Sequence, residues 1–185
     1  MRESGKWVFA CGLSALAMLA ARVDSYAQTQ TLTLNLEAAG LLYNVPASVN
    51  LTNTGTVFNA YVGSVTLQYR ARTSSTGGGT ITAKATTDFT CSAGGPCIGT
   101  PPSAGDALTY TCSGATLGTN CSAQTVSTTA ATNVVTIPAG ACTGAGSPCN
   151  NAAPNTVTVS LSLTDDPKYK TGSYSATLTW TISAT

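Results

Sequence analysis

The 185-residue sequence contains no histidine. This absence excludes every catalytic scheme that uses an imidazole, including the Ser-His-Asp type, and it removes the commonest metal ligand. Charged residues make up only 8% of the chain, with 8 lysines and arginines against 7 acids. So balanced a charge gives no electrostatic reason to expect nucleic acid or an anionic membrane as a partner.

Carboxylates are scarce as well, because Glu37 is the only glutamate after residue 27 and four aspartates accompany it. A glycosidase needs two placed carboxyl groups, and a serine nucleophile needs a base beside it. No Ser-x-x-Lys pattern occurs after residue 27 either. The sequence therefore predicts that the protein is not an enzyme and carries no cofactor.

The N-terminal segment has the pattern of a secretory signal peptide. Arg2 and Lys6 precede an apolar run over residues 8–21, which is shorter than the roughly 20 residues that span a bilayer. Ser25-Tyr26-Ala27 then supplies the small residues of a cleavage site. We expect residues 1–27 to be removed and residues 28–185 to form one domain, with no membrane insertion after cleavage. The alternative is an uncleaved anchor. The expected location is the periplasm, the cell surface or the extracellular space.

Six cysteines follow this leader: Cys91, Cys97, Cys112, Cys121, Cys142 and Cys149. An even number in an exported chain indicates three disulfides, and six cysteines allow 15 pairings. Each successive pair encloses a short segment rich in Gly, Ser or Pro, so we predict the three sequential bonds. Each would contribute roughly 2–3 kcal/mol by restricting the unfolded chain. The alternative zinc site would lack both histidine and any Cys-x-x-Cys motif.

Alternation of apolar residues with Thr or Ser dominates the chain, and threonine occupies 33 positions after residue 27. This period of two is typical of half-buried strands. It predicts strands on these apolar sets: Leu32, Leu34 and Leu36; Val45, Ala47, Val49 and Leu51; Val65, Leu67, Tyr69 and Ala71; Ile81, Ala83 and Ala85; Val157, Val159, Leu161 and Leu163; Tyr174, Ala176, Leu178, Trp180 and Ile182.

The glycine-rich turn over residues 74–79 predicts that residues 64–86 form a hairpin. Residues 91–154 hold all six cysteines and few large apolar side chains, so we expect loops there with short strands near 107–112 and 133–137. A separate small disulfide domain is the alternative for this region. No helical period occurs outside the leader. The sequence predicts an all-β sandwich of about eight strands with disulfide-stapled loops.

The C-terminal segment GSYSATLTWTI, residues 172–182, opens an alternating strand with Gly-x-Tyr. Together with the exported, Thr-rich and charge-poor β pattern, it resembles the end of spore coat protein U-type domains and related fimbrial subunits. The resemblance implies an immunoglobulin-like sandwich of a secreted bacterial surface or pilus protein.

Several residues are candidate sites, each with a simpler structural interpretation. Asp165 and Asp166 could ligate calcium or could begin a solvated turn that Pro167 fixes. Arg70, Arg72 and Lys84 would share one hairpin face, where they could bind an anionic sugar or simply discourage edge pairing. Trp180 could stack on a sugar, but its spacing places it with the core-facing set.

The terminal strands carry the functional prediction. Leu32, Leu34 and Leu36 could complete a neighbouring molecule's sheet, or could be the first strand of the domain's own sheet. We predict a structural or adhesive surface protein, a subunit of a fimbria-like or coat assembly joined by β-strand association. Expected partners are further copies or sister surface subunits, and a periplasmic chaperone. The alternative is a carbohydrate-binding module that uses the stapled loops.

Overall fold

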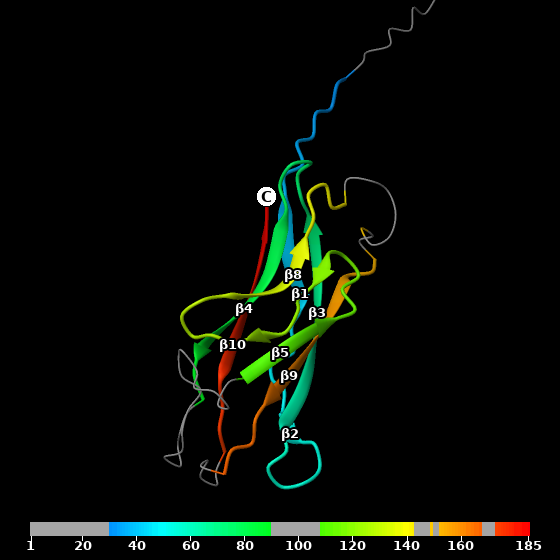
Figure 1. Ribbon diagram of the computed structural model, residues 1–185. Coiled ribbons are helices and arrows are strands. Elements are labelled where there is room, and N and C mark those ends of the chain that lie inside the picture. The colour runs from blue at the N-terminus through cyan, green and yellow to red at the C-terminus, as the bar shows by residue number, and fades with distance from the viewer. Residues whose placement is uncertain (1–29, 90–107, 143–148, 150–151, 168–172) are drawn as a thin grey trace, which may run out of the picture. The chain divides into compact units, whose positions relative to one another are not determined.

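The computed structural model describes residues 30–89, 108–142, 149, 152–167 and 173–185. The chain divides into two compact units, Met1–Leu34 and Asn35–Thr185. Within the described residues of the second unit every regular element is a strand, and the strands form two antiparallel sheets packed face to face (Figure 1). The described residues include no helix long and apolar enough to cross a membrane.

The first sheet has the strand order β1-β3-β9-β5-β7, and β2 pairs with β3 at the opposite end from β1. Its strands are β1 (Ala39–Asn44), β2 (Thr52–Asn53), β3 (Tyr61–Arg72), β5 (Leu108–Ser113), β7 (Gln124–Thr125) and β9 (Asn155–Leu163). The long strand β3 pairs along most of its length with β9, from Tyr61 opposite Leu163 to Tyr69 opposite Asn155. This central pair carries the predicted alternation on both strands.

The second sheet has the strand order β10-β4-β8-β6. Its strands are β4 (Gly79–Thr87), β6 (Thr119–Asn120), β8 (Thr132–Ile137) and β10 (Thr177–Ala184). The C-terminal strand β10 pairs only with β4 among the described strands, so it forms one edge of this sheet.

The core lies between the two sheets and consists of the inward-facing residues of their alternating strands. In the first sheet these are Val65, Leu67, Tyr69, Ala71, Leu108, Tyr110, Val157, Val159 and Leu161. In the second they are Ile81, Ala83, Ala85, Val134, Val135 and Ile137. The period-two prediction is therefore confirmed for β3, β4 and β9, because each of these strands has one face against the facing sheet. The short strands expected near 107–112 and 133–137 are present as β5 and β8, but β8 does not alternate, because consecutive Val134 and Val135 are both buried beside a register shift.

The predicted hairpin over residues 64–86 is wrong. Strands β3 and β4 lie in different sheets, so the turn between them is a corner that carries the chain across the sandwich. Thr73 fixes this corner, since its hydroxyl donates to the Pro138 carbonyl at 2.8 Å and accepts from the Ala141 N–H at 2.8 Å. Both strands still bury their apolar residues, but they do so against each other across the core.

The strand predicted over residues 45–51 is also wrong. Only Thr52–Asn53 pairs with β3, and residues 45–51 run beside the sheet without a regular ladder. Pro46 has no N–H to donate to such a ladder. The last predicted strand is shorter than expected, because Tyr174 and Ala176 precede β10 and lie outside it.

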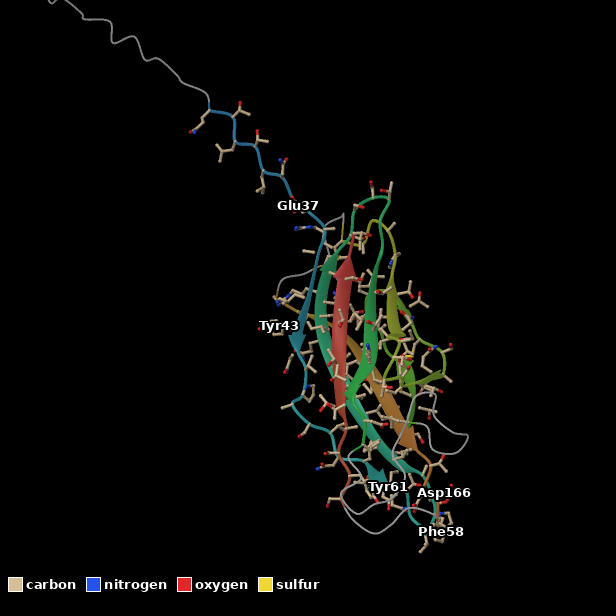
Figure 2. All side chains as sticks on the ribbon, turned by 90° about the vertical axis from the view of Figure 1, so that its left-hand side faces the viewer. Glu37, Tyr43, Phe58, Tyr61 and Asp166 are labelled. Carbon is tan, nitrogen blue, oxygen red and sulfur yellow. A yellow bond between two sulfur atoms is a disulfide. The ribbon has the colours of Figure 1, made fainter. Side chains whose placement is uncertain are left out.

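The two ends of the sandwich unit carry different features. Glu37 lies at one end, and Phe58, Tyr61 and Asp166 lie at the other (Figure 2). The 12-residue strand β3 joins these ends, with Arg72 beside Glu37 and Tyr61 at the opposite end. Glu37, which follows the predicted leucine segment, and Tyr61 therefore lie at opposite ends of this unit.

Candidate assembly site

The N-terminal leucines do not form the first strand of the domain's own sheet. The side chains of Leu32, Leu34 and Leu36 are 85%, 78% and 66% exposed, and residues 30–38 belong to no strand. The first strand is β1, which begins at Ala39. The simpler interpretation of these leucines is therefore wrong, and the described segment presents an alternating apolar set to solvent.

The backbone that follows this segment is held in place at Glu37. The Arg72 guanidinium donates from Nε and Nη2 to the Glu37 carbonyl oxygen, at 2.8 Å and 2.5 Å. Strand pairing continues directly from there, with Ala39 opposite Arg72. Arg72 thus anchors the backbone just after the exposed leucines.

Strand β1 follows the residue that Arg72 holds, and it forms the edge of the first sheet. Leu42 points inward and packs against the core, while Leu41 and Tyr43 are 54% and 57% exposed. The Arg70 guanidinium lies 4.5 Å from the centroid of the Tyr43 ring, a cation–π contact. The pairing of β1 with β3 becomes irregular between Leu42 and Asn44, where β1 ends.

The two sheets approach each other closely near the start of β1. Gly40 of β1 faces Ile182 of β10, and a Cβ at residue 40 would come within 2.9 Å of the Ile182 side chain. Glycine therefore permits the close approach of the two edge strands. Beyond the end of β1 no regular strand continues this contact.

An open cleft of about 990 Å³ takes its place. One wall is the irregular segment over residues 46–51, and the other is residues 174–178 together with Trp180 of β10. Its lining also includes the nearly buried core residues Val65, Leu108 and Leu161 of the first sheet. We call this feature the edge cleft, because its lining includes the segment after the edge strand β1 and residues of the edge strand β10.

Aromatic residues far apart in the sequence gather around the edge cleft. Its lining includes Phe58, Tyr61, Phe89, Tyr174 and Trp180. Phe58 is 55% exposed and has φ 65°, a backbone conformation that bulky residues rarely adopt. An exposed aromatic with a strained backbone beside such a cleft is typical of a contact site.

The predicted candidate residues are distributed differently from the expectation. Asp165 and Asp166 lie in the lining of the edge cleft, and among the described residues they are its only charged side chains. The described residues contain no cluster of three or more metal-ligating Cys, Asp or Glu side chains.

Arg70 and Arg72 are in β3 of one sheet and Lys84 is in β4 of the other, so the prediction that these three residues share one face is wrong. Trp180 packs against the core and also lines the cleft.

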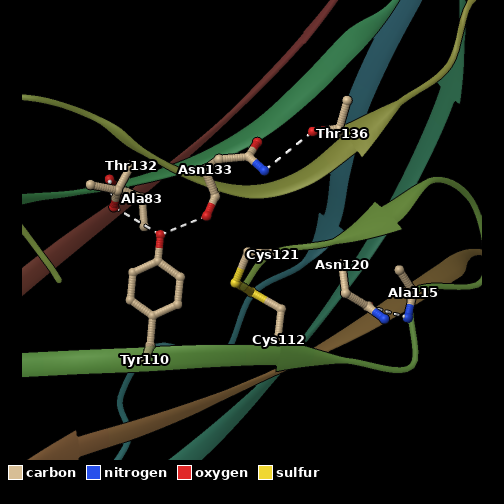
Figure 3. The surroundings of a disulfide bond; sticks show 9 residues. All are labelled: Ala83, Tyr110, Cys112, Ala115, Asn120, Cys121, Thr132, Asn133 and Thr136. Atoms are coloured by element: carbon tan, nitrogen blue, oxygen red, sulfur yellow. Dashed lines mark hydrogen bonds between the residues drawn. A yellow bond between two sulfur atoms is a disulfide. The ribbon is translucent and has the colours of Figure 1, made fainter. Parts of the chain in front are cut away.

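Two of the three predicted disulfides are present, Cys112–Cys121 and Cys142–Cys149. The predicted Cys91–Cys97 bond lies outside the described residues. Cys112 belongs to β5 of the first sheet, and Cys121 follows β6 of the second, so this bond joins the two sheets (Figure 3). Tyr110, the only aromatic residue from 91 to 154, is 2% exposed, and its hydroxyl bonds to Thr132 and Asn133.

Asp88 precedes Phe89 of the cleft and gives a pH-dependent prediction. Burial raises the pKa of its carboxyl group, and the Phe89 N–H bond at 2.7 Å opposes this in part. A raised pKa in the folded state means that stability falls as the pH rises through that pKa. Asp88→Asn keeps an oxygen acceptor for Phe89 and removes the charge.

We therefore expect Asp88→Asn to be more stable than the wild type at neutral pH, with the difference vanishing below the titration range of the carboxyl. Urea midpoints at neutral and acid pH measure this effect. A variant that is less stable at neutral pH would show that the carboxylate itself stabilises the loop.

Comparison of the chain with protein-family models, with curated proteins and with solved structures finds no match. The site must therefore be interpreted from its own geometry. Sequence reasoning found the exposed leucines but missed the edge cleft, because its aromatic residues are scattered between positions 58 and 180 with no local motif.

Proposed function

We propose that the protein is a secreted structural or adhesive surface protein of a bacterial envelope, whose immunoglobulin-like sandwich self-associates through β-strands. The observation that carries the proposal is the alternating set Leu32, Leu34 and Leu36, exposed and outside every strand. Three leucines in this arrangement fit the pockets along a sheet, while the backbone of an extended segment supplies hydrogen bonds to a strand edge. Copies of the chain, or sister surface subunits, would provide that edge.

Further features support this proposal. Two disulfides are compatible with an extracytoplasmic setting, and the fold has free strand edges at β1 and β10 among the described strands. No side chain over residues 28–36 carries a charge that would oppose pairing. A periplasmic chaperone would protect such a segment before assembly.

The alternative carbohydrate-binding function has less support in the stapled loops. Glycan recognition there would use an exposed aromatic, but Tyr110 is buried and hydrogen-bonded. We therefore retain strand association as the proposed function.

The experiment measures the mass of residues 28–185 in solution by light scattering after size exclusion. We expect concentration-dependent assemblies, and we expect them to disappear when residues 28–37 are deleted. A full-length comparison replaces Leu32, Leu34 and Leu36 with serine, and its matched control replaces Thr31, Thr33 and Asn35 instead. The leucine variant should be monomeric because three buried leucines contribute roughly 1.5–3 kcal/mol each. The control should assemble like the wild type. A wild-type chain that remains monomeric at every concentration would contradict the proposed function.

A further inference from the structure

We infer that the edge cleft binds an organic cation of the quaternary ammonium type, in which methyl groups replace the N–H donors around the charge. Such binding needs only one copy of the chain, so it is independent of the self-association proposed above. A neutral sugar and an uncharged apolar molecule are the alternative ligands, and the titrations below distinguish all three.

The described lining of the edge cleft carries negative charge without a basic side chain. Asp165 and Asp166 are both partly buried, and no described lysine or arginine lines the cleft. The two carboxylates follow the end of β9, where Leu163 pairs with Tyr61 of β3. A charge attracts its counterpart more strongly in a half-buried site than in open water, because the effective dielectric constant is lower there. The described lining therefore favours a positively charged ligand.

Aromatic rings supply the second element of recognition for such a cation. The described lining contains the exposed Phe58 and four partly buried aromatic residues, Tyr61, Phe89, Tyr174 and Trp180. The π-electron face of a ring attracts a cation, most strongly for tryptophan, and the attraction increases as water is excluded. The half-buried rings of the cleft are thus suited to a positive charge that carries methyl groups.

The loop between β2 and β3 holds Phe58 at the cleft before any ligand arrives. Asn53 accepts a hydrogen bond from the Gly55 N–H at 2.9 Å and donates one from its side-chain amide to the Asn59 carbonyl at 3.1 Å. The Asn59 amide in turn donates to the Thr56 hydroxyl at 2.6 Å. These bonds enclose Phe58 with its φ of 65°. An aromatic side chain on a loop fixed in this way loses little conformational entropy on binding.

The charge and part of the aromatic surface lie at the same end of the sandwich unit. Figure 2 shows Phe58, Tyr61 and Asp166 together at this end. The nearly buried Val65 lines the cleft four residues further along β3, roughly 13 Å from Tyr61. We therefore place the cationic group of the ligand near Tyr61, at the end of the cleft where carboxylate and ring occur together.

The lining also favours one class of organic cation over another. A primary ammonium has three N–H donors, and each of them needs an acceptor once it leaves water. A trimethylammonium group has no donor to satisfy, and its methyl groups can pack against apolar side chains of the lining such as Leu163 and Leu178. The cleft should accordingly prefer a quaternary ammonium to a primary one.

Trp180 provides a direct readout, because the other tryptophan of the sequence is Trp7 in the predicted leader. The protein is residues 28–185 with Leu32, Leu34 and Leu36 changed to serine, so that the titrated species is one copy of the chain. The probe is choline, and we expect a saturable change in Trp180 emission. Its neutral isostere 3,3-dimethylbutan-1-ol should bind about tenfold more weakly or worse, and so should ethanolamine, its primary ammonium counterpart.

The three comparison ligands decide between the alternatives. Binding of the neutral isostere as tightly as choline would show that the cleft selects apolar shape and would overturn the inference. Equal binding of ethanolamine would overturn the preference for a quaternary ammonium. A saturable response to glucose without one to choline would assign the cleft to neutral sugars instead.

A charge variant tests the role of the carboxylates. Asp165→Asn removes one charge from the cleft, and Glu37→Gln removes one from an exposed residue at the opposite end of the unit as the matched control. With both variants folded by circular dichroism, Asp165→Asn should weaken choline binding by about threefold or more and leave binding of the neutral isostere unchanged. Glu37→Gln should bind choline like the parent protein. Equal choline affinities for the two variants would contradict a site that recognises the cation through its carboxylates.

Discussion

Tyr69→Ala is expected to lower the free energy of unfolding by about 3–5 kcal/mol, the usual cost of removing a large aromatic side chain from a core. Tyr69 lies near the end of β3 and is fully buried. Since a domain of this kind is stabilised by roughly 5–15 kcal/mol, the loss would be a large part of the total. Urea unfolding followed by circular dichroism measures it.

The hydroxyl group of Tyr69 gives this residue a second role. It donates to the Leu117 carbonyl and accepts from the Leu117 N–H at 3.3 Å, so the side chain holds the connection between β5 and β6. Burial raises the pKa of this hydroxyl, which therefore stays protonated and able to donate. Tyr69→Phe keeps the ring but leaves two buried backbone groups without this partner, so we expect a loss of about 1–3 kcal/mol.

Tyr43→Ala is the matched control, because Tyr43 is 57% exposed on β1 and its ring makes a cation–π contact with the Arg70 guanidinium at 4.5 Å. Its loss should stay below about 1 kcal/mol. Equal losses for Tyr69→Ala and Tyr43→Ala would show that the inward face of β3 is not the centre of the core.

The inward faces of the long strands could be predicted from the sequence because a period of two determines them without knowledge of the neighbours. Leu67 and Val157 alternate with polar residues, and both are fully buried. The same pattern could not say which strand pairs with which. The turn after β3 is compatible with both a hairpin and a corner between the sheets. The contacts that make it a corner come from Pro138 and Thr185, which are distant in sequence.

The candidate site, too, could be predicted only in part from the sequence. Alternation identified Leu32, Leu34 and Leu36, but only the fold reveals that β1 occupies the sheet edge that they were expected to take. The edge cleft left no local signal, because its walls come from a segment after β1 and a segment before β10. A surface assembled from both ends of the chain depends on tertiary packing, which a single sequence does not display.

Removing the bond between Cys112 and Cys121 is the second change with a large expected effect. The double variant Cys112→Ala/Cys121→Ala avoids a free thiol. Loss of the loop constraint alone should cost roughly 2–3 kcal/mol. Cys121 is also 8% exposed and its N–H donates to the Val134 carbonyl at 3.0 Å, so its side chain packs where the bond joins the two sheets.

The double variant Cys142→Ala/Cys149→Ala separates the contribution of the loop constraint from that of packing between the sheets. The sequence separations of the bonds are 9 and 7 residues, so the chain-entropy costs of removing them differ little. Cys121 belongs to the buried core, whereas Cys142 and Cys149 are only partly buried. Any larger loss for the first pair therefore reports packing between the sheets. We expect the urea midpoint to fall further without Cys112–Cys121 than without Cys142–Cys149. Equal urea midpoints for the two double variants would mean that both bonds act on the unfolded chain alone. The apolar core would then hold the two sheets together without a contribution from the Cys112–Cys121 bond.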